Sequence, residues 1–396
     1  MLRLLCKNLS QTRPFAESTP PPPSLTTTKS ILNGTHSRFL ENPSPKSITH
    51  LTNRPKKGDP SPTTVSYLIN SCGLSPESAL KVSVRIKSTE KADSVIAFFK
   101  NHGFSQTHIT SMITRHPKLL SYDPDKTLKP KMEFFLHKVG FSASHLVELV
   151  STSPQMLDGS LERRLIPSFD FLKGIVGSDE NAIAAISRSP QLLRHDLPII
   201  LSSKAALLRG NGMRESDISR CIMKYPRDFH VSHDRFIEAV SEIKKIGFDP
   251  LSRSYTEALH VMLGMSSSNW QRKCEVYKSL GFSEDELLKI FKKYPVGMQL
   301  SETKIRKGME FFMKCLNWDP SAISKYPVAL NLSLEKRIIP RYTVMQMLLS
   351  NGLLKKDVNW GAIFMLKEKD FLKKFVNKYQ GEAPKLMEAY SKEVGV

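Results

Sequence analysis

Apolar and polar positions along most of the chain repeat with a period of about 35 residues. The repeat is anchored on six prolines whose successive separations are 37, 36, 36, 69 and 32 residues: Pro117, Pro154, Pro190, Pro226, Pro295 and Pro327. The residue four places before each proline and the residue three places after it are apolar in every copy. Because helical periodicity is interrupted at such regular points, the pattern predicts a stacked array of helical repeats.

The residues around each proline predict how one repeat is built. A first helix ends at the proline, because proline disfavours helical geometry in the residue before it. Six residues later lie side chains that can accept a hydrogen bond from a free amide at the start of a second helix: Asp123, Ser160, Asp196, Ser232, Ser301 and Ser333. Regularly spaced glycines then predict the ends of helices: Gly103, Gly140, Gly177, Gly212, Gly247, Gly281 and Gly352. Each repeat is therefore expected to contain two helices joined by a short apolar turn.

The chain is expected to divide into residues 1–60, a repeat region at 63–352 and C-terminal capping helices at 353–396. One repeat lacks the proline and has Val261 in its place, and we expect its cap at Ser267. Asn317 replaces one of the glycines. Phe364 to Tyr379 reads as a charged amphipathic helix, the kind of element that covers the open end of a repeat array.

Residues 1–60 have a different composition from the rest of the chain. They contain nine Lys and Arg against three Asp and Glu, together with fifteen Ser and Thr and nine Pro. Such a segment is typical of an organelle transit peptide. The amphipathic start, Met1-Leu2-Arg3-Leu4-Leu5-Cys6-Lys7, favours the mitochondrion, whereas the richness in Ser, Thr and Pro leaves the chloroplast as the alternative.

The charge of the chain predicts a polyanionic partner. The formal net charge is +20, and the residues after position 60 keep +14 of it. No apolar run approaches the ~20 residues that cross a membrane. An excess of this size favours nucleic acid or an anionic surface as the partner.

Two columns of basic residues recur at fixed offsets from the prolines. Nine residues after them lie Lys126, Arg163, Ile199, Arg235, Lys304 and Lys336. A cation near a helix start is disfavoured by the helix dipole, so this column suggests a row of phosphate contacts. The alternative is a solvated face paired with neighbouring acids such as Glu162 and Glu335. The second column lies two residues before the prolines, where cations cap helix ends: Arg115, Arg188, Lys224, Lys293 and Lys325.

One eight-residue motif occurs twice and resembles a known family. Ser160-Leu161-Glu162-Arg163-Arg164-Leu165-Ile166-Pro167 returns as Ser333-Leu334-Glu335-Lys336-Arg337-Ile338-Ile339-Pro340. With the Gly-Phe-Ser entries and Xaa-Pro-x-x-Leu turns, the chain resembles the mitochondrial transcription termination factor (mTERF) family, in its plant branch. The resemblance implies an all-α superhelical solenoid in which each repeat has two α-helices and a short 3-10 turn. It also implies an organellar protein whose basic concave face binds nucleic acid, and we include Arg164 and Arg337 among the expected contacts.

The sequence contains no motif that predicts catalysis, a cofactor or a metal. It has no Gly-x-x-x-x-Gly-Lys loop, no His-Glu-x-x-His and no Gly-x-Ser-x-Gly, and its histidines show no ligand spacing with cysteines. We therefore expect a non-enzyme that acts as a monomer.

Three functions remain open. The first is binding of double-stranded DNA to regulate organellar transcription or its termination, through a row that contacts mainly phosphates. The second is binding of RNA to assist intron splicing or transcript maturation, which would need aromatic side chains such as Tyr225, Tyr294 and Tyr326 to stack on unpaired bases. The third is a protein-binding helical scaffold, which the basic charge disfavours.

Overall fold

The computed structural model describes residues 61–82, 86, 88–194, 196–355 and 357–394. The expected transit peptide at residues 1–60 lies outside these residues. Every regular element within them is a helix, which confirms the all-α class. Contacts divide the described chain into two units. The first, called the N-terminal unit here, holds the described residues up to Leu136 together with Ser142–Leu157, and the C-terminal unit holds His137–Phe141 and everything from Asp158 onward.

The N-terminal unit begins with short capped helices and continues into the first repeats. Ser75 caps a helix that starts with Pro76, because its hydroxyl accepts a hydrogen bond from the backbone amide of Ser78. The helices and turns are α2 (Pro62–Asn70), α3 (Pro76–Lys81), α4 (Thr89–Asn101), α5 (Gln106–Arg115), η1 (Pro117–Ser121), η2 (Pro124–Leu128), α6 (Lys129–Glu133), η3 (Phe134–Val139, which runs on into the C-terminal unit), α7 (Ala143–Thr152) and η4 (Pro154–Leu157).

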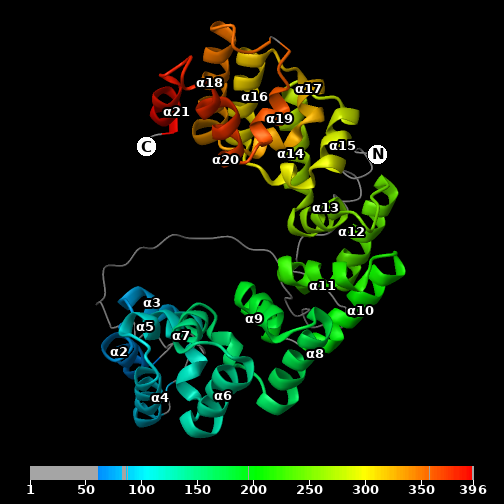
Figure 1. The fold of residues 1–396 in the computed structure, drawn as a ribbon. Coiled ribbons are helices and arrows are strands. Elements are labelled where there is room, and N and C mark those ends of the chain that lie inside the picture. Colours follow the sequence, from blue (N-terminus) through cyan, green and yellow to red (C-terminus); the bar gives the residue numbers. More distant parts are fainter. Residues whose placement is uncertain (1–60, 83–85, 87, 195, 356, 395–396) are drawn as a thin grey trace, which may run out of the picture. The chain divides into compact units, whose positions relative to one another are not determined.

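The C-terminal unit continues the same alternation of helices and short turns (Figure 1). Its first part contains η5 (Leu161–Leu165), α8 (Ile166–Val176), α9 (Asp179–Arg188), η6 (Pro190–Arg194), α10 (Leu197–Gly210), α11 (Glu215–Lys224), η7 (Pro226–His230), α12 (His233–Ile246), α13 (Arg253–Gly264) and α14 (Ser267–Ser279). Its second part contains α15 (Glu284–Lys293), η8 (Pro295–Gln299), α16 (Glu302–Leu316), α17 (Pro320–Lys325), η9 (Pro327–Asn331), η10 (Leu334–Ile338), α18 (Ile339–Ser350), α19 (Trp360–Met365), α20 (Glu368–Phe371), η11 (Leu372–Val376), η12 (Asn377–Tyr379) and α21 (Leu386–Val394).

The anchoring prolines start 3-10 turns, as expected. Each of the six prolines is the first residue of such a turn: η1, η4, η6, η7, η8 and η9. The apolar residue three places later is buried in every copy, with at most 4% of its surface exposed. The turn therefore inserts a side chain between packed helices, and the aligned columns of the sequence correspond to the core.

Equivalent helices of successive repeats pack against each other within each unit. First helices contact first helices, as in the pairs α9 with α11, α13 with α15 and α15 with α17. Second helices also contact each other, as in α8 with α10 and α10 with α12 (Figure 1). Each interface between one repeat and the next is called a seam here.

The helix ends follow the predicted glycine positions. Gly177 and Gly247 end α8 and α12 in the left-handed conformation, with φ of 87° and 84°. This region favours glycine because a Cβ atom would be strained there. Asn317 ends α16 in the same way with φ of 53°, which confirms that it stands in for the missing glycine.

Two local predictions were wrong. In the repeat without proline the cap is Ser266 and not Ser267, because α13 continues as a helix to Gly264 and no 3-10 turn follows it. The segment 364–379 is not one helix, because the chain bends at Leu366 and Lys367 between α19 and α20. In the second case the amphipathic pattern continued through a turn that carries no glycine or proline.

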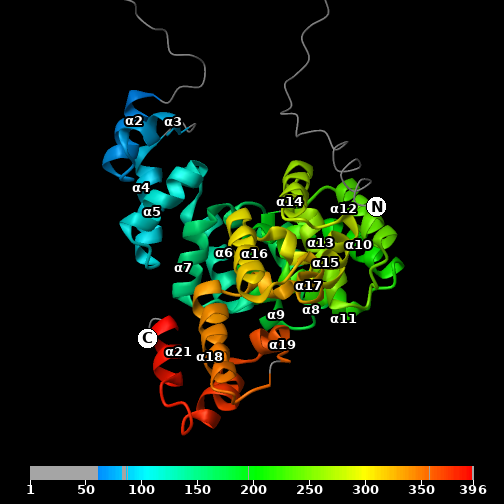
Figure 2. The same cartoon turned by 90° about the horizontal axis from the view of Figure 1, so that it is seen from above.

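The C-terminal helices cover the end of the last repeat. Helix α21 lies beside α18 in both views (Figure 2), and the two contact each other along an apolar cluster that includes Val344, Leu348, Leu386 and Tyr390. Arg341 on α18 is fully buried and pairs with Glu368 at 2.8 Å.

Candidate nucleic-acid interface

The second helices begin in two different ways. In three repeats the first buried apolar residue donates its amide to the capping residue five places earlier: Leu128 to Asp123, Leu165 to Ser160 and Ile338 to Ser333. In α12 and α16 the corresponding hydrogen bond spans four residues, from Phe236 to Ser232 and from Ile305 to Ser301. The first group therefore starts with a π turn, which contains one residue more than an α-helical turn.

Proline explains where the π turns form. Pro130, Pro167 and Pro340 follow these three starts. Proline has no amide hydrogen, and its ring excludes the carbonyl group four residues earlier. Those earlier residues are Lys126, Arg163 and Lys336, so the helix widens at each of them.

The extra residue of the π turn leaves three predicted contacts in solvent. The side chains of Lys126, Arg163 and Lys336 are exposed and donate no hydrogen bond to any described residue. Their backbone amides are held by the capping residues Asp123, Ser160 and Ser333. These three cations are available for an external anion.

Three other predicted contacts bind the protein's own backbone. Arg235 donates to the carbonyl oxygens of Met262, Leu263 and Met265 at 2.9–3.4 Å. Lys304 donates to Asn331 at 2.6 Å. Arg337 donates to Phe364 and Leu366 at 3.1 and 2.6 Å. Each of these side chains holds the turn or helix end of the following repeat, and we call a side chain with this role a seam cation.

Arg164, the last predicted contact, lies against the backbone just before it. Its guanidinium packs so closely on Gly159 that a Cβ atom at Gly159 would approach it to 2.4 Å. Gly159 has φ of 82°, so both its conformation and this contact favour glycine. Arg164 is half-buried, whereas its neighbour Arg163 is exposed.

Further seam cations are buried, and the proline-based alignment did not predict them. Lys131 donates to Leu157, Lys204 to Phe229 and Val231, and Lys273 to Leu300. Arg341 donates to Ile363, Phe364 and Leu366. All four are at most 8% exposed, and each follows a buried apolar residue of its second helix by three positions. A buried cation of this kind is stable only because carbonyl groups accept its hydrogens.

The two sets of seam cations occupy two positions that are four residues apart on one helix face. In α12 and α16 the earlier position holds the cation and the later one holds Ala239 or Gly308. Where the later position holds Lys131, Lys204 or Lys273, the earlier one is not basic. The last repeat differs, because Arg337 and Arg341 occupy both positions and both donate to carbonyl groups. An alignment that starts from the capping residue obscures this pattern, because each π turn adds one residue and moves the two seam positions by one. The prolines four places after Lys126, Arg163 and Lys336 were the signal that could have revealed it.

Three residues of the second basic column bind helix ends of the next repeat, whereas the sequence predicts that they cap their own helices. Arg115 donates to Thr152 at 2.8 Å, Arg188 to Met223 at 2.5 Å and Lys293 to Ser324 at 3.3 Å. These carbonyl groups lie at the ends of α7, α11 and α17. These three residues therefore link neighbouring first helices.

Burial lowers the pKa of some seam cations. Loss of solvent around Lys204 lowers its pKa to about 8. Burial also lowers the pKa of Lys273 and of Arg337. The seam is thus a place where charge is costly and is held by carbonyl acceptors.

The described residues contain no group of three or more His, Cys, Asp or Glu side chains placed to hold a metal ion. Among those residues, no helix is long and apolar enough to span a bilayer. His260 pairs with Asp228 at 3.0 Å and stacks on Tyr225. Burial raises the pKa of Asp228, and the pair joins two adjacent repeats.

The repeated helix–turn–helix units and their seams define a helical-repeat solenoid. The model of the mTERF family matches residues 62–175, 96–196 and 169–372. The chain therefore belongs to the mTERF family. It is also similar to the Arabidopsis thaliana protein "Transcription termination factor MTERF8, chloroplastic", with 23% identity over 257 residues that cover 65% of this chain and 50% of that protein. The chain thus spans about half the length of the curated relative it matches.

Proposed function

We propose that this protein binds nucleic acid in an organelle, with double-stranded DNA as the favoured ligand, and that it regulates transcription or its termination. The observation that carries the proposal is the exposure of Lys126, Arg163 and Lys336 at capped helix starts. The helix dipole makes a cation at this position cost about 0.3–1 kcal/mol, so packing and capping do not account for it. A bound phosphate would account for a cation at this position.

The relative supports transcription as the process and an organelle as the compartment. It carries the name of a chloroplastic transcription termination factor. The amphipathic start of this chain favours the mitochondrion instead. Imaging of the full chain fused at its C-terminus to a fluorescent protein will identify the organelle, and a cytosolic signal would contradict the organellar proposal.

Aromatic packing favours a duplex over unpaired bases. The ring of Tyr225 stacks on His260 with centroids 3.9 Å apart, and the Lys224 ammonium lies 4.8 Å from the centroid of the Tyr225 ring. Tyr326 stacks with Trp318. Because these rings are partly buried and already stacked on other rings of the protein, they offer little free surface for base stacking. RNA binding for splicing or transcript maturation is the second candidate, supported by the same exposed cations.

Salt-dependent binding tests the proposal. Replacing Lys126, Arg163 and Lys336 with Gln should lower affinity for duplex DNA and flatten the slope of log affinity against log salt by about 0.9 per lost contact. The charge-matched control replaces Lys81, Lys138 and Lys314, which are exposed and paired with Glu77, Asp170 and Glu310. Equal effects of the two triple variants would contradict specific contacts. A preference for single-stranded RNA with a slope change of about 0.7 per contact would favour the second candidate.

A further inference from the structure

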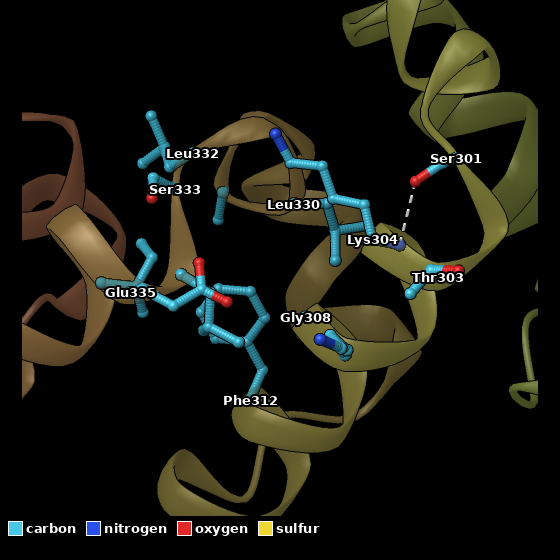
Figure 3. A pocket seen from close by; sticks show the side chains of 13 residues that line it. Ser301, Thr303, Lys304, Gly308, Phe312, Leu330, Leu332, Ser333 and Glu335 are labelled. Atoms are coloured by element: carbon cyan, nitrogen blue, oxygen red, sulfur yellow. Dashed lines mark hydrogen bonds between the residues drawn. The ribbon is translucent and has the colours of Figure 1, made fainter.

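The seam between α16 and the turn that follows it contains a pocket of about 320 Å³ (Figure 3). Its apolar surface is formed by Phe312, Leu330 and Ile338. Lys304, Lys307 and Glu335 contribute polar groups. Figure 3 shows Gly308 and Glu335 on opposite sides of the pocket, with the Lys304 side chain directed away from Phe312.

The pocket exists because Gly308 occupies the later seam position. In four other second helices this position holds a buried cation, Lys131, Lys204, Lys273 or Arg341, whereas α12 has Ala239 there. Gly308 has no side chain to fill the space, although a Cβ atom there would meet the Leu330 side chain at 3.0 Å. Lys304 serves as the seam cation instead, but it reaches only the carbonyl of Asn331 and leaves the interior open.

The missing cation leaves hydrogen-bond acceptors unused. In the seam after α10, Lys204 binds the carbonyl oxygens three and five residues after Pro226, which belong to Phe229 and Val231. The equivalent residues after Pro327 are Leu330 and Leu332, and both line the pocket. Among the described residues neither of these two carbonyls accepts a hydrogen bond.

A carboxylate adds negative charge at the same place. The Glu335 side chain is turned toward the middle of the pocket in Figure 3, and within the described chain it forms no ion pair. Lys307 and Glu335 are both exposed, so solvent and salt screen the charge of each. The pocket is therefore lined by an apolar wall, by Leu330 and Leu332, whose carbonyl groups have no donor among the described residues, by one carboxylate and by Lys304 and Lys307.

We propose that this pocket binds a linear primary alkylammonium group, such as the end of a short aliphatic diamine or polyamine. The ammonium donates to the carbonyls of Leu330 and Leu332 and pairs with Glu335. The alkyl chain lies along the apolar wall, in the place that a lysine side chain fills in the α10 seam. The ligand thus completes a seam that the chain itself leaves open. The proposed amine binding does not depend on nucleic-acid binding.

Calorimetry and thermal melting of the full chain test the proposal with n-butylammonium and 1,4-diaminobutane as probes. Both should bind saturably and raise the melting temperature. Neutral n-butanol and tetramethylammonium, which has no N–H donor, should not. Binding to wild type by neither amine, or an equal shift with tetramethylammonium, would overturn the proposal.

Three variants locate the site. Gly308→Lys should fill the pocket from within and weaken amine binding at least about tenfold, as expected when a site is occupied. Gly174→Lys is the matched control, because Gly174 is an exposed helical glycine with nothing within 4 Å of an added Cβ. Glu335→Gln keeps the shape and should weaken binding several-fold, so it decides the question if Gly308→Lys does not fold. If both single variants, Glu335→Gln and Gly308→Lys, bind the amine with unchanged affinity, the amine binds elsewhere. If Gly308→Lys does not fold, unchanged affinity in Glu335→Gln alone leads to the same conclusion.

Discussion

Lys336 and Arg337 are adjacent in the chain, but only Arg337 is held by the protein. Its guanidinium donates to the carbonyls of Phe364 and Leu366, whereas the Lys336 side chain is exposed and donates to no described residue. The π turn separates them, because the amide of Ile338 reaches back five residues to Ser333. Two neighbouring cations of one motif therefore have different roles, one toward the fold and one toward solvent.

The first prediction separates these roles. Arg337→Gln should lower the free energy of unfolding by about 1 kcal/mol, because it removes two hydrogen bonds to the carbonyls of Phe364 and Leu366, which keep Arg341 as a donor. Lys336→Gln should change it by less than about 0.5 kcal/mol and should instead reduce the salt dependence of nucleic-acid binding. Chemical denaturation and binding titrations of both variants check this. Equal losses of stability would show that Lys336 is also structural.

The repeat, its 3-10 turns and most caps could be predicted because they depend on short-range chemistry. A proline or a glycine specifies its turn locally, as at Pro154 and Gly177. The same sequence did not predict which basic residues are free, because that depends on acceptors about 27 residues away. Lys304 donates to Asn331 and Arg235 to Met262, and no local pattern indicates these distant carbonyl groups.

The buried seam cations were missed for a related reason. Lys204 looks like a surface residue in the sequence, yet it is 3% exposed between α10 and η7. A lysine is rarely buried unless it is paired. Its acceptors are main-chain carbonyls, which carry no signature of residue type. The signal that could have identified Lys204 is the relation between the two seam positions four residues apart, after correction for the extra residue of the π turns.

The second prediction concerns the pH dependence of stability at Lys204. The pKa of this amine is about 8 in the fold, below its ordinary value of 10.5. Below pH 8 both states hold the proton, so the cost of burying the charge is fully present. Between pH 8 and about 10.5 the unfolded chain binds more protons, so the stability of the fold rises with pH relative to a variant without the amine.

Lys204→Met provides that reference. The difference in free energy of unfolding between wild type and Lys204→Met should move in favour of wild type by about 1–3 kcal/mol from pH 7 to pH 10, since each pKa unit corresponds to about 1.4 kcal/mol. Denaturant titrations at several pH values measure it. A difference that stays constant with pH would mean that the carbonyls of Phe229 and Val231 keep the pKa of Lys204 near its ordinary value.

The third prediction compares two buried core residues with Arg188, which links two neighbouring first helices. Leu157→Ala should destabilise the protein by about 2–5 kcal/mol, because Leu157 is completely buried in the turn η4. Leu330→Ala should cost a similar amount in η9. Arg188→Ala should cost about 1 kcal/mol or less, because its side chain is exposed and donates one hydrogen bond to Met223. Similar melting temperatures for all three variants would contradict the assignment of the apolar columns to the core.

The last prediction tests the origin of the π turn. Deleting Lys336 places Arg337 three residues after Ser333 and Ile338 four residues after it, the spacing that Arg235 and Phe236 have after Ser232. In that register Pro340 would lie inside an α-helix, where proline costs about 3 kcal/mol. The deletion alone should therefore destabilise the protein, and adding Pro340→Ala should recover most of the loss. Circular dichroism and thermal melting of the deletion, the substitution and the double variant measure how far the effect of the deletion on stability depends on Pro340. If Pro340→Ala does not recover stability in the deletion, the proline is not the cause of the wider turn.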